Sequence, residues 1–153
     1  VVNSGGVSRT FLPNDVINNN ASANTIADVT GLSFAVLANT TYSFKFFIVY
    51  SSSATTTGSR WSINGPATTF INYTSRYTLT ATSITNNAGV AAYNTPSGSS
   101  ASSLTANNIC IIEGIIRPSA PGTVIARFAS EISGSAVTAI AGGRSYAEYQ
   151  VIN

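Results

Sequence analysis

The chain is poor in charge, and it contains no histidine and no methionine. Only 8% of its 153 residues are charged, whereas a typical globular domain has roughly 25%. Without histidine, the Ser-His and Cys-His arrangements of nucleophilic catalysis are excluded in their usual forms. A single cysteine, Cys110, excludes an intrachain disulfide, and its apolar neighbours predict a buried thiol.

The five acidic residues are too scattered along the chain to predict a metal or cofactor site. We therefore expect no catalytic, cofactor-binding or metal-ligating residues, and no enzyme activity. Glycoside hydrolysis needs two carboxylates that folding brings together, and Glu113 and Glu131 are the candidates because both lie in apolar segments. The simpler expectation is that each pairs with an arginine, such as Arg127 or Arg117.

The seven basic residues form no cluster, and the net charge is only +2. Binding to a nucleic-acid backbone depends on clustered Lys and Arg, so no nucleic-acid partner is expected. No apolar segment reaches the roughly 18 residues of a membrane span, so no membrane partner is expected either. Ser, Thr and Asn supply most of the polarity, and such a neutral surface packs against protein at little desolvation cost. This composition favours a subunit of an assembly.

Alternation of apolar and polar residues is the strongest pattern in the chain and predicts β-strands. The clearest strand is 41–50, and one of its faces carries Tyr42, Phe44, Phe46, Ile48 and Tyr50. We expect this face to be core, while the other face changes from polar to apolar, which indicates a central strand. Further strands are expected at 7–12, 25–29, 32–37, 59–64, 76–82, 109–117, 123–132, 136–140 and 146–152.

These strands predict an all-β fold, an antiparallel β-sandwich of jelly-roll-like type with about eight to ten strands. Residues 1–24 are expected to form an N-terminal arm or extended segment with a short turn of helix near 13–18, and residues 25–153 a single sandwich domain. A turn is expected at 86–89. The Ser- and Gly-rich segment 96–103 is expected to be an exposed loop that contacts a neighbouring subunit.

One hairpin is predicted in detail, with the turn 118–122 joining two apolar strands. Its register places Glu113 opposite Arg127, and Ile115 opposite Ile125, on one face. A half-apolar face with an ion pair suits contact with another subunit. These four residues are therefore the predicted interface.

Trp61 and Tyr93 are candidates for stacking on a glycan, since aromatic rings bind the apolar faces of sugars. Trp61 alternates with polar residues in 59–64, so core packing is the main expectation for it. The exposure of these two side chains distinguishes a glycan-binding head from a purely structural subunit.

Four stretches together resemble one group of known proteins. They are 30–44, 56–66, 112–131 and 141–149. They are similar to structural proteins of tailed bacteriophages and prophages that occur as capsid-decorating or tail-associated domains. The resemblance spans roughly residues 25–152 and consists of strand, turn and core residues, with no catalytic residue among them.

The resemblance implies a β-sandwich or jelly-roll domain located in a virion and often trimeric. We therefore expect a structural virion protein, specifically a capsid decoration or cement protein. Its expected partners are other copies of itself, with a homotrimer favoured, and the major capsid protein or another virion protein. Three other functions are compatible with the sequence: a receptor- or glycan-binding domain of a tail fibre, a glycosidase or lyase, and a secreted jelly roll similar to C1q or tumour necrosis factor.

Overall fold

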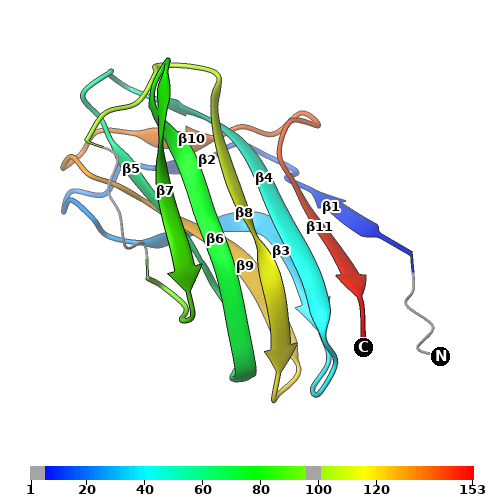
Figure 1. The fold of residues 1–153 in the computed structure, drawn as a ribbon. Helices are drawn as coiled ribbons and strands as arrows, with labels where there is room; N and C mark the ends of the chain where they lie inside the picture. The colour runs from blue at the N-terminus through cyan, green and yellow to red at the C-terminus, as the bar shows by residue number, and fades with distance from the viewer. Residues whose placement is uncertain (1–5, 96–100) are drawn as a thin grey trace.

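The computed structural model describes residues 6–95 and 101–153, which form strands and no helix. Two antiparallel sheets pack face to face as a jelly-roll-like β-sandwich (Figure 1). The fold class predicted from the alternation is therefore confirmed. Within the described residues, no helix is long and apolar enough to cross a membrane.

Eight strands form the larger sheet. They are β1 (Ser8–Phe11), β2 (Val16–Asn18), β4 (Tyr42–Ser52), β6 (Thr68–Thr80), β7 (Ser83–Val90), β8 (Asn108–Pro118), β10 (Val137–Ala139) and β11 (Tyr146–Val151). Their order is β1-β11-β4-β8-β6-β7, and β10 joins the sheet by pairing with β4 and β2. The larger sheet faces the viewer in Figure 1.

Three strands form the smaller sheet. They are β3 (Ala27–Val36), β5 (Ser59–Asn64) and β9 (Gly122–Ser130), in the order β3-β9-β5. From β3 to β6 the chain alternates between the two sheets, and it crosses again from β8 to β9. Each such crossing places neighbouring segments of sequence on opposite sides of the core.

The core lies between the two sheets and takes one face from each. The predicted core face of β4 is buried along its whole length, as expected. Trp61 of β5 stacks on Phe128 of β9 with ring centroids 5.0 Å apart, and it lies 4.8 Å from the ring of Tyr50 across the core. Cys110 of β8 is buried as predicted, and burial raises the pKa of its thiol.

The predicted hairpin around the turn 118–122 is wrong, because its two strands lie in different sheets. β8 pairs with β4 and β6, whereas β9 pairs with β3 and β5. Ile112 and Ile116 of β8 therefore face Val124 and Phe128 of β9 from opposite sides of the core, and all four are buried. Two strands paired in a hairpin and two strands in opposite sheets both need an apolar residue at every second position. The alternation therefore cannot distinguish the two arrangements.

Part of the segment predicted as an arm belongs to the sandwich. β1 pairs with β11 and β2 pairs with β10, and Leu12 between them is buried. The side-chain Nδ2 of Asn18 in β2 donates hydrogen bonds to the backbone carbonyls of Thr25, at 3.0 Å, and Phe128, at 2.9 Å. These bonds connect β2 to the rest of the sandwich. The short helix expected at 13–18 is absent, since its residues 16–18 form β2. Residues 1–5 lie outside the described part.

A hairpin of β6 and β7 occupies the region where one strand, 76–82, and a turn at 86–89 were expected. The four residues of that expected turn lie within β7. The register of β6 against β7 shifts between Tyr73 and Ser75. Gly89 lies on β7 opposite this shift, in a left-handed conformation with a φ of 66°. Of the expected loop 96–103, residues 96–100 lie outside the described part of the chain.

β3 joins two strands that the sequence predicts separately, 25–29 and 32–37. The register of β3 against β9 shifts between Asp28 and Ser33. Gly31 lies in this interval with a φ of 92°, and an added Cβ would lie 2.8 Å from the ring of Pro13. The bulge therefore needs glycine at this position.

Candidate protein interface

A row of alternating charges crosses the outer face of the larger sheet. Arg9 of β1 lies opposite Glu148 of β11, which itself lies opposite Lys45 of β4. Lys45 lies opposite Glu113 of β8, and Arg76 of β6 reaches the same carboxylate from the far side. The signs along the row are plus, minus, plus, minus, plus. We name these five residues the charge row.

An ion pair lies at each end of the charge row. Arg9 Nε donates to Glu148 Oε2 at 2.7 Å, and Arg76 Nη2 donates to Glu113 Oε1 at 2.5 Å. The hydrogen bond and the charge of Glu148 raise the pKa of Arg9. In the middle of the row, no carboxylate oxygen of the described residues lies within 4.0 Å of the Lys45 ammonium. The row therefore carries one positive charge that forms no ion pair with the described residues of its own chain.

An apolar row runs beside the charge row, two residues further along the strands. It consists of Phe11, Tyr146, Phe47 and Ile111, which follow one another in register across β1, β11, β4 and β8. Tyr146 stacks on Phe47 with ring centroids 5.4 Å apart and an angle of 13° between the rings. Phe11 is 51% exposed. Partly exposed aromatic and aliphatic side chains therefore continue across the sheet.

Two hollows lie on this face. One, of about 340 Å³, opens over the three central members of the charge row. The other, of about 520 Å³, lies toward β7 and is lined in part by Arg76, Ile84 and Ile109. Ile84 is 59% exposed and Ile109 is 41% exposed, and Ile109 is the register partner of Val49. The face is thus apolar and uneven, and most of its charged groups lie in the charge row.

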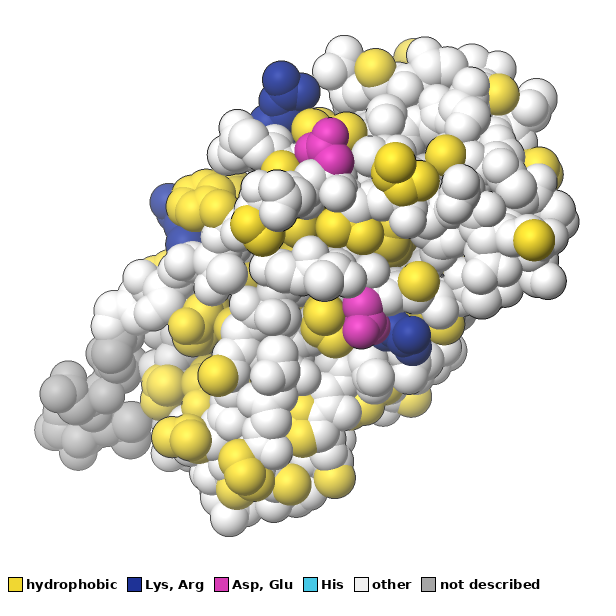
Figure 2. All heavy atoms as spheres, turned by 180° about the vertical axis from the view of Figure 1, so that it is seen from behind, with side chains coloured by type: hydrophobic (Ala, Val, Ile, Leu, Met, Phe, Trp, Pro, Cys, Tyr) yellow, Lys and Arg dark blue, Asp and Glu magenta, His cyan; other side chains and the backbone are white. Residues whose placement is uncertain are grey.

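The outer face of the smaller sheet has a different character. Figure 2 shows the molecule from that side, with apolar side chains scattered among neutral polar ones and few charged groups. Arg127 Nε of β9 lies 2.8 Å from Asp28 Oδ1 of β3, and Arg60 of β5 pairs separately with Glu131. These charges form individual pairs, in contrast to the row on the larger sheet.

The structure does not bring the four predicted interface residues together. Glu113 and Ile115 lie on the outer face of β8, whereas Ile125 and Arg127 lie on the outer face of β9, on the other side of the sandwich. Glu113 pairs with Arg76 and not with Arg127. Glu113 and Ile115 therefore share the candidate face, and the other two residues do not.

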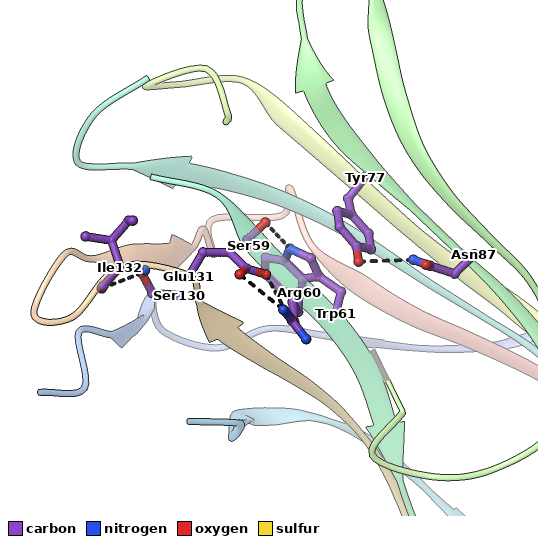
Figure 3. A network of polar contacts seen from close by, with 8 residues as sticks. All are labelled: Ser59, Arg60, Trp61, Tyr77, Asn87, Ser130, Glu131 and Ile132. Atoms are coloured by element: carbon purple, nitrogen blue, oxygen red, sulfur yellow. Dashed lines mark hydrogen bonds and ion pairs between the residues drawn. The ribbon is translucent and has the colours of Figure 1, made fainter. Parts of the chain in front are cut away.

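Trp61 is not available to stack on a glycan, because its exposed fraction is 0%. Its Nε1 donates to Ser59 Oγ at 2.9 Å (Figure 3). Tyr93 is half-buried, and its hydroxyl donates to the carbonyl of Pro66 at 2.8 Å. Burial raises the pKa of Tyr93 to about 12. Core packing, the main expectation for Trp61, is confirmed, and the two residues form no exposed platform.

The two carboxylates considered for glycoside hydrolysis lie in separate ion pairs. Glu113 belongs to the charge row, whereas Glu131 follows β9 and accepts a hydrogen bond from Arg60 Nε at 2.5 Å (Figure 3). Each pairs with an arginine as expected, although not with either of the two that the sequence suggested. Among the described residues, no three Cys, Asp or Glu side chains gather into a group that could hold a metal ion.

The charge row was missed at the sequence level because its members are far apart in the chain. Arg9 and Glu148 are separated by 139 positions, and only the strand register places them side by side. The available signal was the alternation itself. Lys45, for example, is the charged residue between the buried Phe44 and Phe46, so it must point outward from a central strand.

Comparison with known proteins gives limited matches. No protein-family model and no curated protein matches this chain. The tumour necrosis factor Eiger of S. frugiperda is 12% identical with a TM-score of 0.49, over 96% of this chain and 92% of that chain. Two infectious bursal disease virus structures, the VP2 subviral particle and the T13 viral particle, are 12% and 13% identical with TM-scores of 0.43 and 0.42. The match spans 97% and 95% of this chain but only 36% and 35% of those chains, and these values are too low to transfer a function.

Proposed function

We propose that the chain is a non-enzymatic structural subunit of a bacteriophage virion, and that it acts as a capsid decoration or cement protein. The observation that carries this proposal is the outer face of the larger sheet, where the charge row and the apolar row lie side by side. Monomeric soluble proteins rarely expose wide apolar patches, and patches rimmed by polar groups are typical of protein interfaces. The bacteriophage part of the proposal is supported by the sequence resemblance over residues 25–152.

The distribution of charge supports the same proposal. The chain has seven basic and five acidic residues, and five of these twelve lie in the charge row. Almost half of the charged residues therefore lie in one row, while the others are spread over a surface on which Ser, Thr and Asn are common. A neutral surface gives little electrostatic repulsion between densely packed subunits.

The mechanism of such a subunit is physical. Burial of apolar surface contributes roughly 25 cal/mol per Å², and a typical interface buries about 800 Å² on each partner. The charges add selectivity, because like charges placed together at an interface cost several kcal/mol. A subunit bound across capsomer junctions adds such contacts to the shell and stabilises the assembled state by mass action.

Binding to particles tests the proposal. Shells purified from the source phage with this chain deleted should take up the added protein at a fixed ratio to the major capsid protein. They should then rupture at a higher temperature, measured by release of packaged DNA. Phe47→Glu, which places a charge in the apolar row, should fold and lose uptake, whereas Ile125→Glu on the opposite face should retain it. Uptake by tails alone would replace the decoration role, and the absence of binding to any part of the virion would refute the proposal.

A further inference from the structure

We infer that the outer face of the larger sheet binds a second copy of this same chain. Two copies form a face-to-face dimer about a two-fold axis parallel to β4 and β8, with Lys45 of each copy against Glu113 of the other. This inference rests on the proposed function and deepens it, because it makes this face the contact between copies within the unit that binds the shell, so that Phe47→Glu would lose uptake by preventing that unit from forming.

The charges on β4 and β8 are complementary to each other. These strands are neighbours at the centre of the sheet, and Lys45 and Glu113 are register partners at one level. A rotation about an axis parallel to the strands leaves each residue at the same height along that axis. It therefore brings β4 of one copy against β8 of the other with Lys45 and Glu113 at the same height. Each Lys45 then meets a Glu113 of another copy, and no like charges meet at that level.

The same rotation also matches apolar side chains. Phe47 and Ile111 are register partners, and so are Val49 and Ile109. The rotation therefore places Phe47 against Ile111 of the other copy, and Val49 against Ile109. All four are half-buried or exposed in the single chain. A face whose two central strands complement each other level by level favours a second copy of the chain over an unrelated protein.

Both charged groups are available for this contact. Lys45 has no ion-pair partner among the described residues of its own chain. Arg76 binds Oε1 of Glu113, and the Glu113 side chain is still 45% exposed. The hollow of about 340 Å³ between Lys45, Glu113 and Glu148 gives the approaching side chains room.

Charge reversal tests the inference through the native mass of the chain in dilute solution. Lys45→Glu and Glu113→Lys each place like charges at both contacts of the dimer, and each should weaken assembly at least about ten-fold. The double variant restores opposite charges at both contacts of the dimer and should recover the wild-type mass. Arg127→Glu is the matched control, because it breaks a comparable ion pair on the far face of the sandwich and should assemble as the wild type does.

Mixing separates contacts between copies from damage within each chain. Each single reversal also disturbs its own charge row, so thermal unfolding of every variant is followed by circular dichroism. In an equimolar mixture of Lys45→Glu and Glu113→Lys, the mixed junctions again carry opposite charges, and assembly should recover although neither chain has changed. If a reversal prevents folding, Lys45→Met removes the charge without repulsion and should still weaken assembly.

Three results would overturn the inference: a wild-type chain that is monomeric at its highest soluble concentration, a single reversal that assembles as the wild type does, or folded variants that regain no assembly when mixed or combined. The proposed function is decided separately by uptake onto particles. A monomer that decorates shells would retain the proposed function and refute the dimer. A dimer that binds no particle would support the inference and refute the proposed function. Contact through the two central strands is satisfied by two copies, whereas in a trimer the sheet edges would meet, so the native mass should be that of a dimer.

Discussion

Gly114 of β8 lies opposite Tyr73 of β6, and the two backbones approach so closely that no Cβ fits between them. A Cβ added to Gly114 would lie 2.1 Å from the carbonyl oxygen of Asn72 and 2.6 Å from the Cα of Tyr73. These are backbone atoms of a paired strand, so no side-chain rotation can relieve the overlap. The backbones of β6 and β8 are therefore in close contact beside the ion pair of Arg76 and Glu113.

Gly114→Ala is expected to lower the free energy of unfolding by about 1–3 kcal/mol or more, because β6 must move away from β8 to admit the methyl group. Urea unfolding of the variant and the wild type measures the difference. Gly6→Ala is the control, since an added Cβ there meets nothing within 4 Å, and it should change stability by less than about 0.5 kcal/mol. Equal stability of Gly114→Ala and the wild type would contradict the close approach of the two strands.

Trp61 is the only tryptophan in the sequence. Its fluorescence is expected to show that the indole is shielded from water and that it does not bind a glycan. The indole is fully buried against Phe128 and Tyr50, so its native emission should be blue-shifted and resistant to a soluble quencher. Unfolding should shift the emission to the red. Adding mono- or oligosaccharides to the folded protein should leave the spectrum unchanged. A saccharide-dependent change would bring back the glycan-binding function that the burial of Trp61 opposes.

Stability is expected to decline in alkaline solution. Burial raises the pKa of Tyr50 from 10.0 to about 12, and burial also raises the pKa of Tyr77. Between about pH 10 and 12 the unfolded chain releases these protons while the folded chain keeps them, so rising pH favours unfolding. The expected slope is up to about 1.4 kcal/mol per pH unit for each tyrosine.

The melting temperature measured from neutral pH to about pH 12 checks this prediction. Tyr50→Phe removes one of the titrating groups, so its stability should fall less steeply above about pH 10 than that of the wild type. A variant whose alkaline slope equals that of the wild type would show that Tyr50 does not contribute to the decline.

Glu131→Gln is expected to lower the free energy of unfolding by about 1–3 kcal/mol, because it removes the negative charge that pairs with the partly buried Arg60. The side chains of Arg60 and Glu131 are only 32% and 12% exposed. Glu148→Gln removes the corresponding charge from the more exposed pair with Arg9 and should cost less, because water screens exposed charges. Chemical unfolding at a concentration where the chain is monomeric compares the two, and a larger loss for Glu148→Gln would reverse the expected order.

Alternation in the sequence predicted which side chains enter the core, but not which strands pair. The predicted strand 59–64 coincides with β5, and the predicted core face of β4 is buried. For β8 and β9, however, inward-facing Ile112 and Phe128 satisfy the same pattern in a hairpin and in two opposed sheets. The structure places β8 between β4 and β6, where both of its edges are hydrogen-bonded along most of their length.

The strand β7 was missed because tertiary hydrogen bonds override a local turn preference. Asn, Ala and Gly in succession are typical of a turn. In the structure, the buried Asn87 donates to the carbonyl of Ser75, at 3.3 Å, and to the hydroxyl of Tyr77, at 3.0 Å. Partners on β6 thus hold an asparagine inside a strand that its own neighbours do not predict.

The β class, the inward face of β4, the burial of Cys110 and the core role of Trp61 could all be predicted from the amino-acid sequence, because they depend on residue type and a period of two. The pairing of Glu113 with Arg76, and the position of Lys45 beside that pair on one face, follow instead from the way the strands assemble. Strand order and register join residues from distant parts of the chain, and no local pattern specifies either. The candidate interface is therefore a property of the assembled sheet, whose rows exist only once its strands have paired.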